Sequence, residues 1–393
     1  MRPILLALFI LAAATALSAN DLTGSVVDAG AKPVNGAQVY VYAAYPRIGV
    51  SAFCPTCYRD CGKHEPVDAK GAFRIAELNN TLLFDVLAVA DGYQSALVRR
   101  VNPAAAPLTI ELTQRTAEEE ERLVRGTVLD PKGKPIAGAV IAPRGYHVPN
   151  GPTVWGIYPG VERVAVTNPK GEFSLRLPSR DGKLDARVEA RGVARHLERA
   201  MAPGEPRTIR MADGVTVTGH LTNEGKPVAG ARIVLVQRNR ASANYLERDE
   251  IATNDDGLFV ITNVPPGESW YVYAAMESIP HGFVEPRLVT TEADGAALDA
   301  GTLTVQRGRH IAGSVVLPAE RMLPPDTKVI LTHFASDDRR AVPVDAAGGF
   351  AFDDAPLSEV MLTTDGPRLH MRSAAKVEAG NDCIDVRLVV PKQ

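Results

Sequence analysis

The chain has 393 residues, of which 45% are hydrophobic and 23% are charged. This length exceeds one ordinary hydrophobic core, and the composition is that of a globular protein, so we expect two to four domains and exclude a largely disordered chain. The formal net charge of -3 argues against nucleic acid as a partner, because phosphate binding requires concentrated positive charge.

The first 19 residues, MRPILLALFILAAATALSA, combine one arginine, an apolar run and small residues before Asn20. This pattern is typical of a secretory signal peptide, and we expect Ala19 to be the last residue removed. No later apolar run approaches the roughly 20 residues that a membrane helix requires. We therefore expect an exported, soluble mature chain, periplasmic or extracellular, without membrane insertion, in a compartment where disulfides persist.

One turn motif then recurs along the chain, as AKPVNGAQV at 31–39, GKPIAGAV at 133–140 and GKPVAGARI at 225–233. Its proline fixes a backbone angle, its glycine permits a bend, and its alanine is small enough to be covered. The three sets are Pro33, Gly36 and Ala37; Pro135, Gly138 and Ala139; and Pro227, Gly230 and Ala231. A fourth copy near Gly313 keeps the flanking strands but lacks the Gly-Lys-Pro core. We expect the motif to close the edge of a β-sandwich.

A second landmark follows each turn, in the strings VDAKGAFRI, TNPKGEFSL, TNDDGLFVI and VDAAGGFAF. Each predicts a hairpin whose glycine takes a left-handed conformation and whose phenylalanine faces the core. The glycines are Gly71, Gly171, Gly257 and Gly348, and the phenylalanines are Phe73, Phe173, Phe259 and Phe350. The landmarks recur about every 100 residues, which is the size of one immunoglobulin-like sandwich.

The remaining segments favour strands, since they are rich in β-branched, aromatic or alternating residues. RTAEEEERL at 115–123 is the one charged helical candidate, and it falls at a predicted linker. We therefore predict an all-β chain of four tandem Ig-like or transthyretin-like antiparallel β-sandwiches after the signal peptide. Their expected bounds are 1–19 for the signal peptide, 20–115, 116–212 including the linker, 213–307, and 308–393 for the degenerate fourth copy. Short linkers predict that the sandwiches stack end to end.

Together the motifs Gly-x-Val-x-Asp, Gly-Lys-Pro-Val/Ile-x-Gly-Ala and Asp/Asn-x-x-Gly-x-Phe resemble the carboxypeptidase regulatory-like domain, a transthyretin-like (prealbumin-like) sandwich found as tandem repeats in exported bacterial proteins. The match covers the first three copies well and the fourth only in its hairpin. The resemblance implies an accessory, folding or binding module with no catalytic residues.

The first copy contains the segment FCPTCYRDCGKHEP, in which Cys54, Cys57, Cys61 and His64 are spaced as C-x2-C-x3-C-x2-H. This set could bind zinc as a tetrahedral site. In an exported chain it could equally form a disulfide staple, with Cys383 as a further partner, or a redox pair. The three interpretations stay open, as does the disulfide connectivity.

The loop YHVPNGPTVWGIYPG places Trp155 and Tyr158 among polar residues, with Tyr146 at its start. Exposed aromatic rings can stack on sugars or proline-rich chains. The alternative is that Trp155 folds back over the end of the sandwich, because large aromatic side chains are usually buried. These three residues are the candidate ligand-binding residues.

Motifs for catalysis are missing: the sequence contains no H-E-x-x-H, no H-x-H and no G-x-S-x-G. We therefore expect no enzyme activity and no cofactor. The leading hypothesis is an exported, monomeric multidomain scaffold that presents loops to a cell-surface polysaccharide or protein. Two alternatives are a secreted carbohydrate- or peptide-binding protein using its aromatic loops, and a metal- or redox-active protein using the Cys54–His64 loop.

Overall fold

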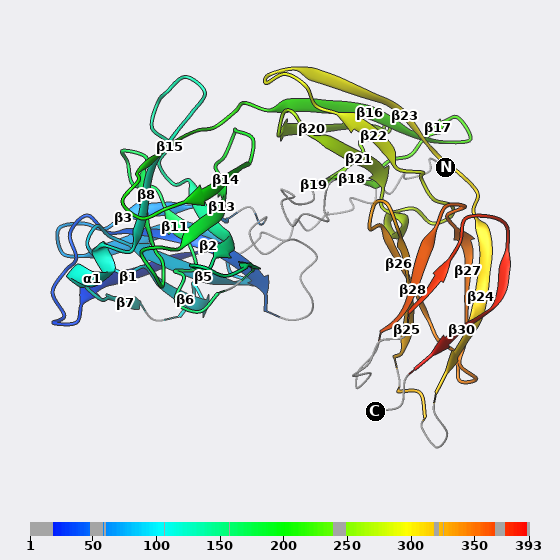
Figure 1. Cartoon of the computed structure of the whole chain (residues 1–393), viewed down its shortest axis with the longest axis horizontal. Helices are drawn as coiled ribbons and strands as arrows, with labels where there is room; N and C mark the ends of the chain where they lie inside the picture. The colour runs from blue at the N-terminus through cyan, green and yellow to red at the C-terminus, as the bar shows by residue number, and fades with distance from the viewer. Residues whose placement is uncertain are drawn as a thin grey trace, which may run out of the picture. The chain divides into compact units, whose positions relative to one another are not determined.

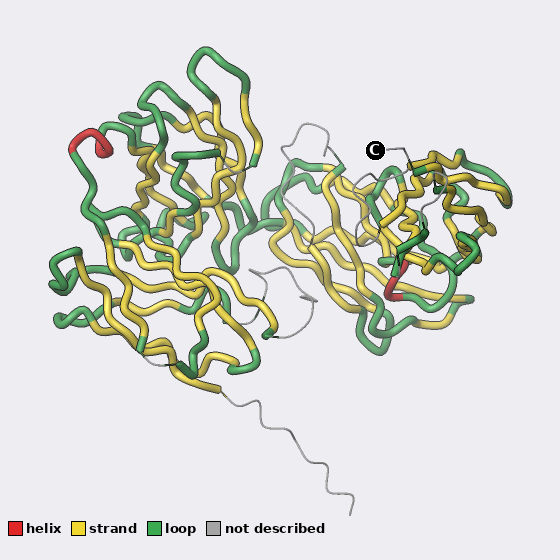
Figure 2. Tube along the Cα trace, turned by 90° about the horizontal axis from the view of Figure 1, so that it is seen from below, coloured by secondary structure: helices red, strands yellow, loops and turns green. Residues whose placement is uncertain are grey.

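The computed structural model describes residues 19–47, 58, 60–105, 107–156, 158–238, 249–317, 322–324, 326–365 and 374–390. The expected signal peptide, apart from Ala19, lies outside these residues, as do Cys54 and Cys57. The regular structure of the described residues is almost all strand, with one short α-helix and one short 3-10 helix (Figures 1 and 2), as the sequence predicts.

Each of the four predicted copies forms two sheets. The first sandwich comprises β1 (Ala19–Asp28), β2 (Gln38–Pro46), β3 (His64–Pro66), β4 (Ala72–Asn79), β5 (Leu82–Val89), β6 (Ala96–Val101) and β7 (Leu108–Leu112), in the sheets β4-β1-β7 and β3-β2-β5-β6. The second sandwich follows the short helix α1 (Ala117–Glu120). It comprises β8 (Leu123–Leu129), β9 (Val140–His147), β10 (Thr153–Trp155), β11 (Ala165–Val166), β12 (Glu172–Arg176), β13 (Lys183–Glu189), β14 (His196–Met201) and β15 (Arg207–Arg210), in the sheets β12-β8-β15 and β10-β9-β13-β14, with β11 beside β9.

The third and fourth sandwiches repeat this order. The third comprises β16 (Val215–Asn223), β17 (Lys226–Pro227), β18 (Arg232–Gln237), β19 (Asp249–Ala252), β20 (Leu258–Val264), β21 (Ser269–Ala274), the 3-10 helix η1 (Met276–Ser278), β22 (Arg287–Thr290) and β23 (Ala297–Val305), in the sheets β17-β16-β20, with β23 beside β16, and β19-β18-β21-β22. The fourth comprises β24 (Arg309–Val316), β25 (Lys328–His333), β26 (Arg339–Pro343), β27 (Gly349–Ala355), β28 (Val360–Asp365), β29 (Ala374–Val377) and β30 (Cys383–Val389), in the sheets β27-β24-β30 and β26-β25-β28-β29.

Antiparallel pairing dominates these sheets, as predicted, but three pairs of strands are parallel, which the sequence did not predict. The last strand of the first, third and fourth sandwiches lies parallel to the first strand of the same sandwich, in the pairs β1–β7, β16–β23 and β24–β30. Parallel neighbours need a long connection. Here the strands of the opposite sheet supply that connection.

The landmark phenylalanines pack against a glycine in the first strand of each copy. These glycines are Gly24, Gly126, Gly219 and Gly313. A Cβ atom added to any of them would lie within 2.9 Å of the ring of the phenylalanine opposite it. It would also lie within 2.7 Å of a backbone carbonyl oxygen. All four phenylalanines are buried. The first strand therefore keeps glycine where the ring crosses it.

Turns in each copy are held by an aspartate or asparagine side chain. Asp68 Oδ1, for example, accepts hydrogen bonds from the Lys70 and Ala72 amides, both at 2.8 Å. Asn168, Asn254 and Asp345 accept two amides in the same way in the other copies. Short polar side chains of this kind stabilise tight turns by bonding to the backbone just ahead. The polar residue of each landmark thus has a structural role.

By its internal packing the chain divides into two compact units. The first comprises residues up to Val128, Pro135–Ala186 and Arg199–Ile209, and the second comprises Leu129–Lys134, Arg187–Glu198 and the residues from Arg210. The residue bounds expected for the four individual domains stay a prediction.

The four-stranded sheet of the first sandwich is apolar on both faces. Val39 and Val41 of β2 face the core of their own sandwich. Tyr40, between them, faces outward and is buried with Leu87, Val164 and Val166 in a separate apolar cluster. Because Val164 and Val166 belong to the second sandwich, the first pair meets through the face of a sheet. The expected end-to-end stacking is wrong for this pair.

Candidate functional site

Apolar and polar contacts together form the junction between the first two sandwiches. Tyr40 is 3% exposed, and burial raises the pKa of its hydroxyl. That hydroxyl lies 2.7 Å from Gln38 Oε1 and 3.1 Å from the carbonyl oxygen of Thr167 in the second sandwich. A buried tyrosine needs such a partner, and here one partner comes from each sandwich.

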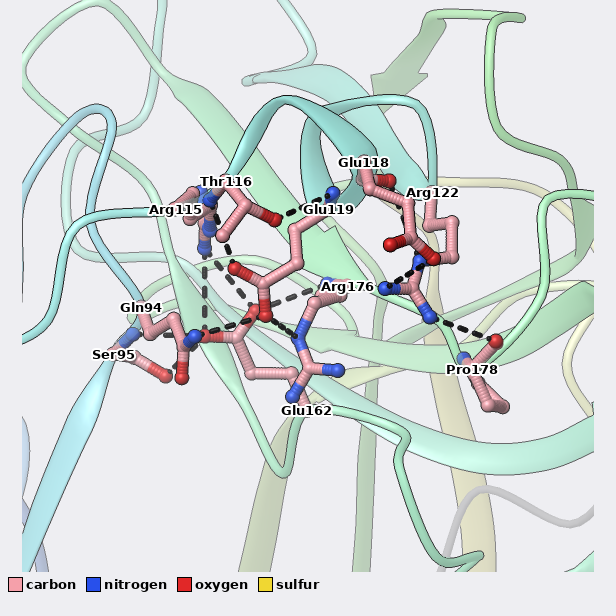
Figure 3. A network of polar contacts seen from close by, with 10 residues as sticks. All are labelled: Gln94, Ser95, Arg115, Thr116, Glu118, Glu119, Arg122, Glu162, Arg176 and Pro178. Atoms are coloured by element: carbon pink, nitrogen blue, oxygen red, sulfur yellow. Dashed lines mark hydrogen bonds and ion pairs between the residues drawn. The ribbon is translucent and has the colours of Figure 1, made fainter.

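A carboxylate from the second sandwich, Glu162, gathers donors from three parts of the first unit (Figure 3). Its Oε1 accepts hydrogen bonds from the Ser95 amide at 2.8 Å and the Ser95 hydroxyl at 2.6 Å, in the loop between β5 and β6. Its Oε2 accepts the Arg176 amide of β12 at 2.9 Å and lies 3.2 Å from Arg115 Nη2 of the linker. One side chain therefore joins the first sandwich, the linker and the second sandwich.

Arg115 and Glu162 form a buried ion pair, with side chains that are 4% and 8% exposed. The guanidinium also donates from Nη1 to the Ser174 hydroxyl at 2.8 Å. Charges this deeply buried are costly unless they are paired and hydrogen-bonded. The pairing therefore fixes how the linker sits between the two sandwiches.

The predicted charged helix is confirmed as α1, and its N-terminus extends the network. Thr116 and Glu119 form a reciprocal capping box, in which the Glu119 amide donates to Thr116 Oγ1 and Glu119 Oε2 accepts the Thr116 amide. Glu119 Oε1 accepts a hydrogen bond from Gln94 at 2.9 Å and pairs with Arg176 Nε at 3.3 Å. The Thr116 amide is the main cause that holds the Glu119 pKa below its ordinary value, with help from Gln94 and Arg176. The linker helix is thereby tied to both sandwiches.

Two hollows lie on this junction. One has a volume of about 370 Å³ and the other about 420 Å³, and Arg115, Asp91, Glu172, Phe173 and Ser174 line both. The first hollow, called here the junction cleft, also includes Gln38, Tyr93, Ser95, Asn168 and Lys170 in its wall.

A second junction lies between the third and fourth sandwiches, where side chains of one sandwich again form hydrogen bonds with backbone groups of the other. The Tyr273 hydroxyl donates to the Ser336 carbonyl oxygen at 3.1 Å, and Asp338 accepts the Met276 amide at 3.1 Å. Arg340 Nη2 donates to the carbonyl oxygens of Met276 and Gly282, at 2.8 and 2.9 Å. Met276 itself is buried in the core of the fourth sandwich. In each unit, therefore, hydrogen bonds and apolar contacts hold two neighbouring sandwiches together.

The candidate cysteine–histidine set is only partly described. Cys61 is buried in the core of the first sandwich, whereas the His64 ring stacks on Tyr40 on the outer face of the same sheet, with ring centroids 5.1 Å apart. The structure therefore does not bring these two side chains together. Among the described residues no group of three or more His, Cys, Asp or Glu side chains is placed to hold a metal ion. Cys383 lies in β30 and forms no disulfide within the described part. The roles of Cys54 and Cys57 stay predictions.

The three candidate aromatic residues have different environments. Tyr146 is buried and its ring lies 4.6 Å from that of Tyr158. Trp155 is 40% exposed and pairs across the strands with Gly145, where an added Cβ would meet the indole ring at 2.8 Å. The indole thus covers a glycine on the sheet edge, and the three rings do not form one platform of exposed aromatics.

A serine and a histidine approach each other in the second unit. His333 Nε2 lies 2.7 Å from Ser358 Oγ, with Glu285 3.8 Å away. The Ser336 amide points its hydrogen at His333 Nδ1, at 3.2 Å. A backbone amide can only donate, so the neutral ring carries its proton on Nε2 and donates to Ser358. This histidine is not oriented to act as a general base towards Ser358.

No protein-family model and no curated protein matches the chain. Among solved structures, the chain is similar to a streptococcal ancillary pilin, with 12% identity and a TM-score of 0.25 over 73% of this chain and 99% of that one. It is similar to the TIE protein of Bacillus anthracis, with 10% identity and a TM-score of 0.20 over 95% and 73%. A minor pilin of Streptococcus agalactiae has 12% identity and a TM-score of 0.23 over 46% and 98%. Within the described residues no helix is long and apolar enough to cross a membrane.

Proposed function

We propose that the protein is an exported, non-catalytic scaffold whose sandwiches are held in rigid pairs, so that their loops face a surface partner at fixed spacing. The observation that carries this proposal is the Glu162 carboxylate, which binds the first sandwich, the linker and the second sandwich at once. A flexible linker would need none of these buried contacts.

Further support comes from the second unit, where Arg340 and Asp338 link the third and fourth sandwiches through backbone groups. An enzyme would require a nucleophile, a base or a metal placed for reaction, and the orientation of His333 does not provide a base for Ser358. We propose that the partner is a cell-surface polysaccharide or protein. We also propose that the sandwiches are related to carboxypeptidase regulatory-like domains.

The test measures residual dipolar couplings of backbone amides in the full-length mature chain, under weak alignment. If the first two sandwiches form one rigid body, a single alignment tensor fits the amides of both. Separate tensors for the two sandwiches would exclude a rigid pair.

A matched pair of variants shows whether Glu162 is responsible. Glu162→Ala should separate the two tensors, because it removes the group that links the three segments. Glu118→Gln alters a carboxylate that is 80% exposed and pairs with Arg122, so it should leave the single tensor intact.

A further inference from the structure

The junction cleft contains a buried side chain with an unused donor. Gln38 is 7% exposed and lines the cleft. Its Oε1 accepts from the Tyr40 hydroxyl, while its amide nitrogen has no hydrogen-bond partner in the part of the chain that the structure describes. The wall also contains a buried donor without a hydrogen-bond partner among the described residues, the Nε of Arg115. Buried polar groups in native proteins are rarely left unbonded. An occupant of the cleft would give the Gln38 amide a partner.

The charges around the cleft do not favour an anion. Glu162 neutralises Arg115, the one guanidinium in the wall. The remaining charged side chains of the wall are the ammonium of Lys170 and the carboxylates of Asp91 and Glu172. Binding of phosphate or a carboxylic acid would require surplus positive charge, and this wall has none.

The same wall fits a molecule with several hydroxyl groups. The carboxylates of Asp91 and Glu172 can accept hydroxyl hydrogens, and the Gln38 amide and Lys170 can donate to hydroxyl oxygens. Tyr93, half-buried at the cleft, adds an aromatic ring with an apolar face. The volume of about 370 Å³ is within the range of small-molecule sites, which often lie between domains and combine apolar surface with a few polar groups.

We propose that the junction cleft binds a short, uncharged oligosaccharide, with Gln38 as donor, Asp91 and Glu172 as acceptors and Tyr93 as stacking surface. This goes beyond the scaffold function, since a rigid pair needs no ligand. It also differs from the aromatic-loop hypothesis, because neither Trp155 nor Tyr158 lines the cleft.

The test is calorimetric titration of the full mature chain with cellobiose, maltose and N,N′-diacetylchitobiose at millimolar concentration. At least one should bind saturably. Gln38→Glu keeps the acceptor for Tyr40 but removes the amide donor, so affinity should fall at least about fivefold. Tyr93→Ala should lower it by about tenfold, whereas Tyr93→Phe keeps the ring and should bind as the parent does.

Two further measurements separate the outcomes. Circular dichroism and the melting temperature of each variant show that it is folded, and Asp91→Asn, at an exposed position, supplies a second variant if Gln38→Glu does not fold. Saturable binding that is lost in Trp155→Ala and kept in Tyr93→Ala would overturn the proposal by placing the site on the aromatic loop. Binding of triglycine with no binding of any sugar would overturn it in favour of a peptide site, and so would the absence of all binding. None of these results bears on the alignment tensors of the unliganded chain.

Discussion

Glu162 shows how a single side chain can determine the geometry of a junction. Its two oxygens lie within 3.2 Å of donors on Ser95, Arg115 and Arg176, and these partners are 67, 47 and 14 residues away in sequence. Removing one member of a buried ion pair costs far more than the pair contributes, because the other charge is left in a poorly solvated site.

We predict that Glu162→Ala lowers the free energy of unfolding of the first unit by about 3–5 kcal/mol. Scanning calorimetry of the full chain measures this as a lower melting temperature of the transition that contains the first two sandwiches. Glu118→Gln, at the exposed carboxylate on the same helix, serves as the control and should melt as the parent does. Equal melting temperatures for Glu162→Ala and the parent would show that the buried pair adds no stability.

Glu119 gives the same junction a pH dependence. The hydrogen bond from the Thr116 amide, with smaller contributions from Gln94 and Arg176, holds the pKa of Glu119 below the ordinary glutamate value of 4.5. A carboxyl whose pKa is lower in the folded state contributes stability above its unfolded pKa, and this contribution disappears as the pH falls through the folded value.

Denaturant titrations of the parent and of Glu119→Gln, made at several pH values between about pH 6 and pH 3, measure the free energy of unfolding of each protein and check this dependence. We expect the difference in stability between the two proteins to be largest near pH 6 and to shrink on acidification below 4.5. A difference that stays constant over the whole range would contradict the assigned role.

Among the elements, short sequence patterns predicted the strands and turns well, but they did not predict how one sandwich packs against the next. The glycine–phenylalanine hairpins and the proline–glycine turns could be predicted because each depends on a few adjacent residues. The outer face of β2 was missed, although its sequence QVYVYAAYP carried a signal. An apolar run without alternation is typical of a strand buried on both faces.

The site of Glu162 could not be predicted in the same way. Its partners come from a loop, a linker and a strand, and no sequence spacing relates them. The cleft residue Gln38 is equally hidden, because its importance depends on burial and on an unbonded amide. The sequence instead pointed to Cys61 and His64, which the fold places on opposite faces of one sheet.

The crossing of a glycine by a phenylalanine ring predicts a strong size limit at Gly126. An added Cβ would lie 2.6 Å from the Arg207 carbonyl oxygen and 2.7 Å from the Phe173 ring. We expect Gly126→Ala to destabilise the first unit by about 1–3 kcal/mol in chemical denaturation, through overpacking. At Gly30 the nearest atom would be a carboxylate oxygen of the Asp28 side chain, 3.3 Å away, and a side chain can shift more easily than backbone. Gly30→Ala should therefore destabilise much less than Gly126→Ala. Similar values for the two variants would contradict the packing argument.

For the whole molecule, the four sandwiches are grouped by junctions that bury both apolar and polar groups. In the first unit, Tyr40 and Leu87 of one sandwich share a buried cluster with Val164 and Val166 of the next. In the second unit, Met276 and Phe283 from the third sandwich belong to the core cluster of the fourth. Two sandwiches that share buried clusters in this way should unfold locally as one cooperative unit, whereas independently folded modules would unfold separately.

Native-state hydrogen exchange of the full chain carrying Gly126→Ala tests this coupling most directly. The substitution lies in the second sandwich, yet we predict that it also speeds exchange of the amides of β2 and β5 in the first sandwich, because their outer face depends on Val164 and Val166. Exchange that accelerates only in the second sandwich, with β2 and β5 unchanged, would show that the first two sandwiches are independent and would contradict the rigid-pair account.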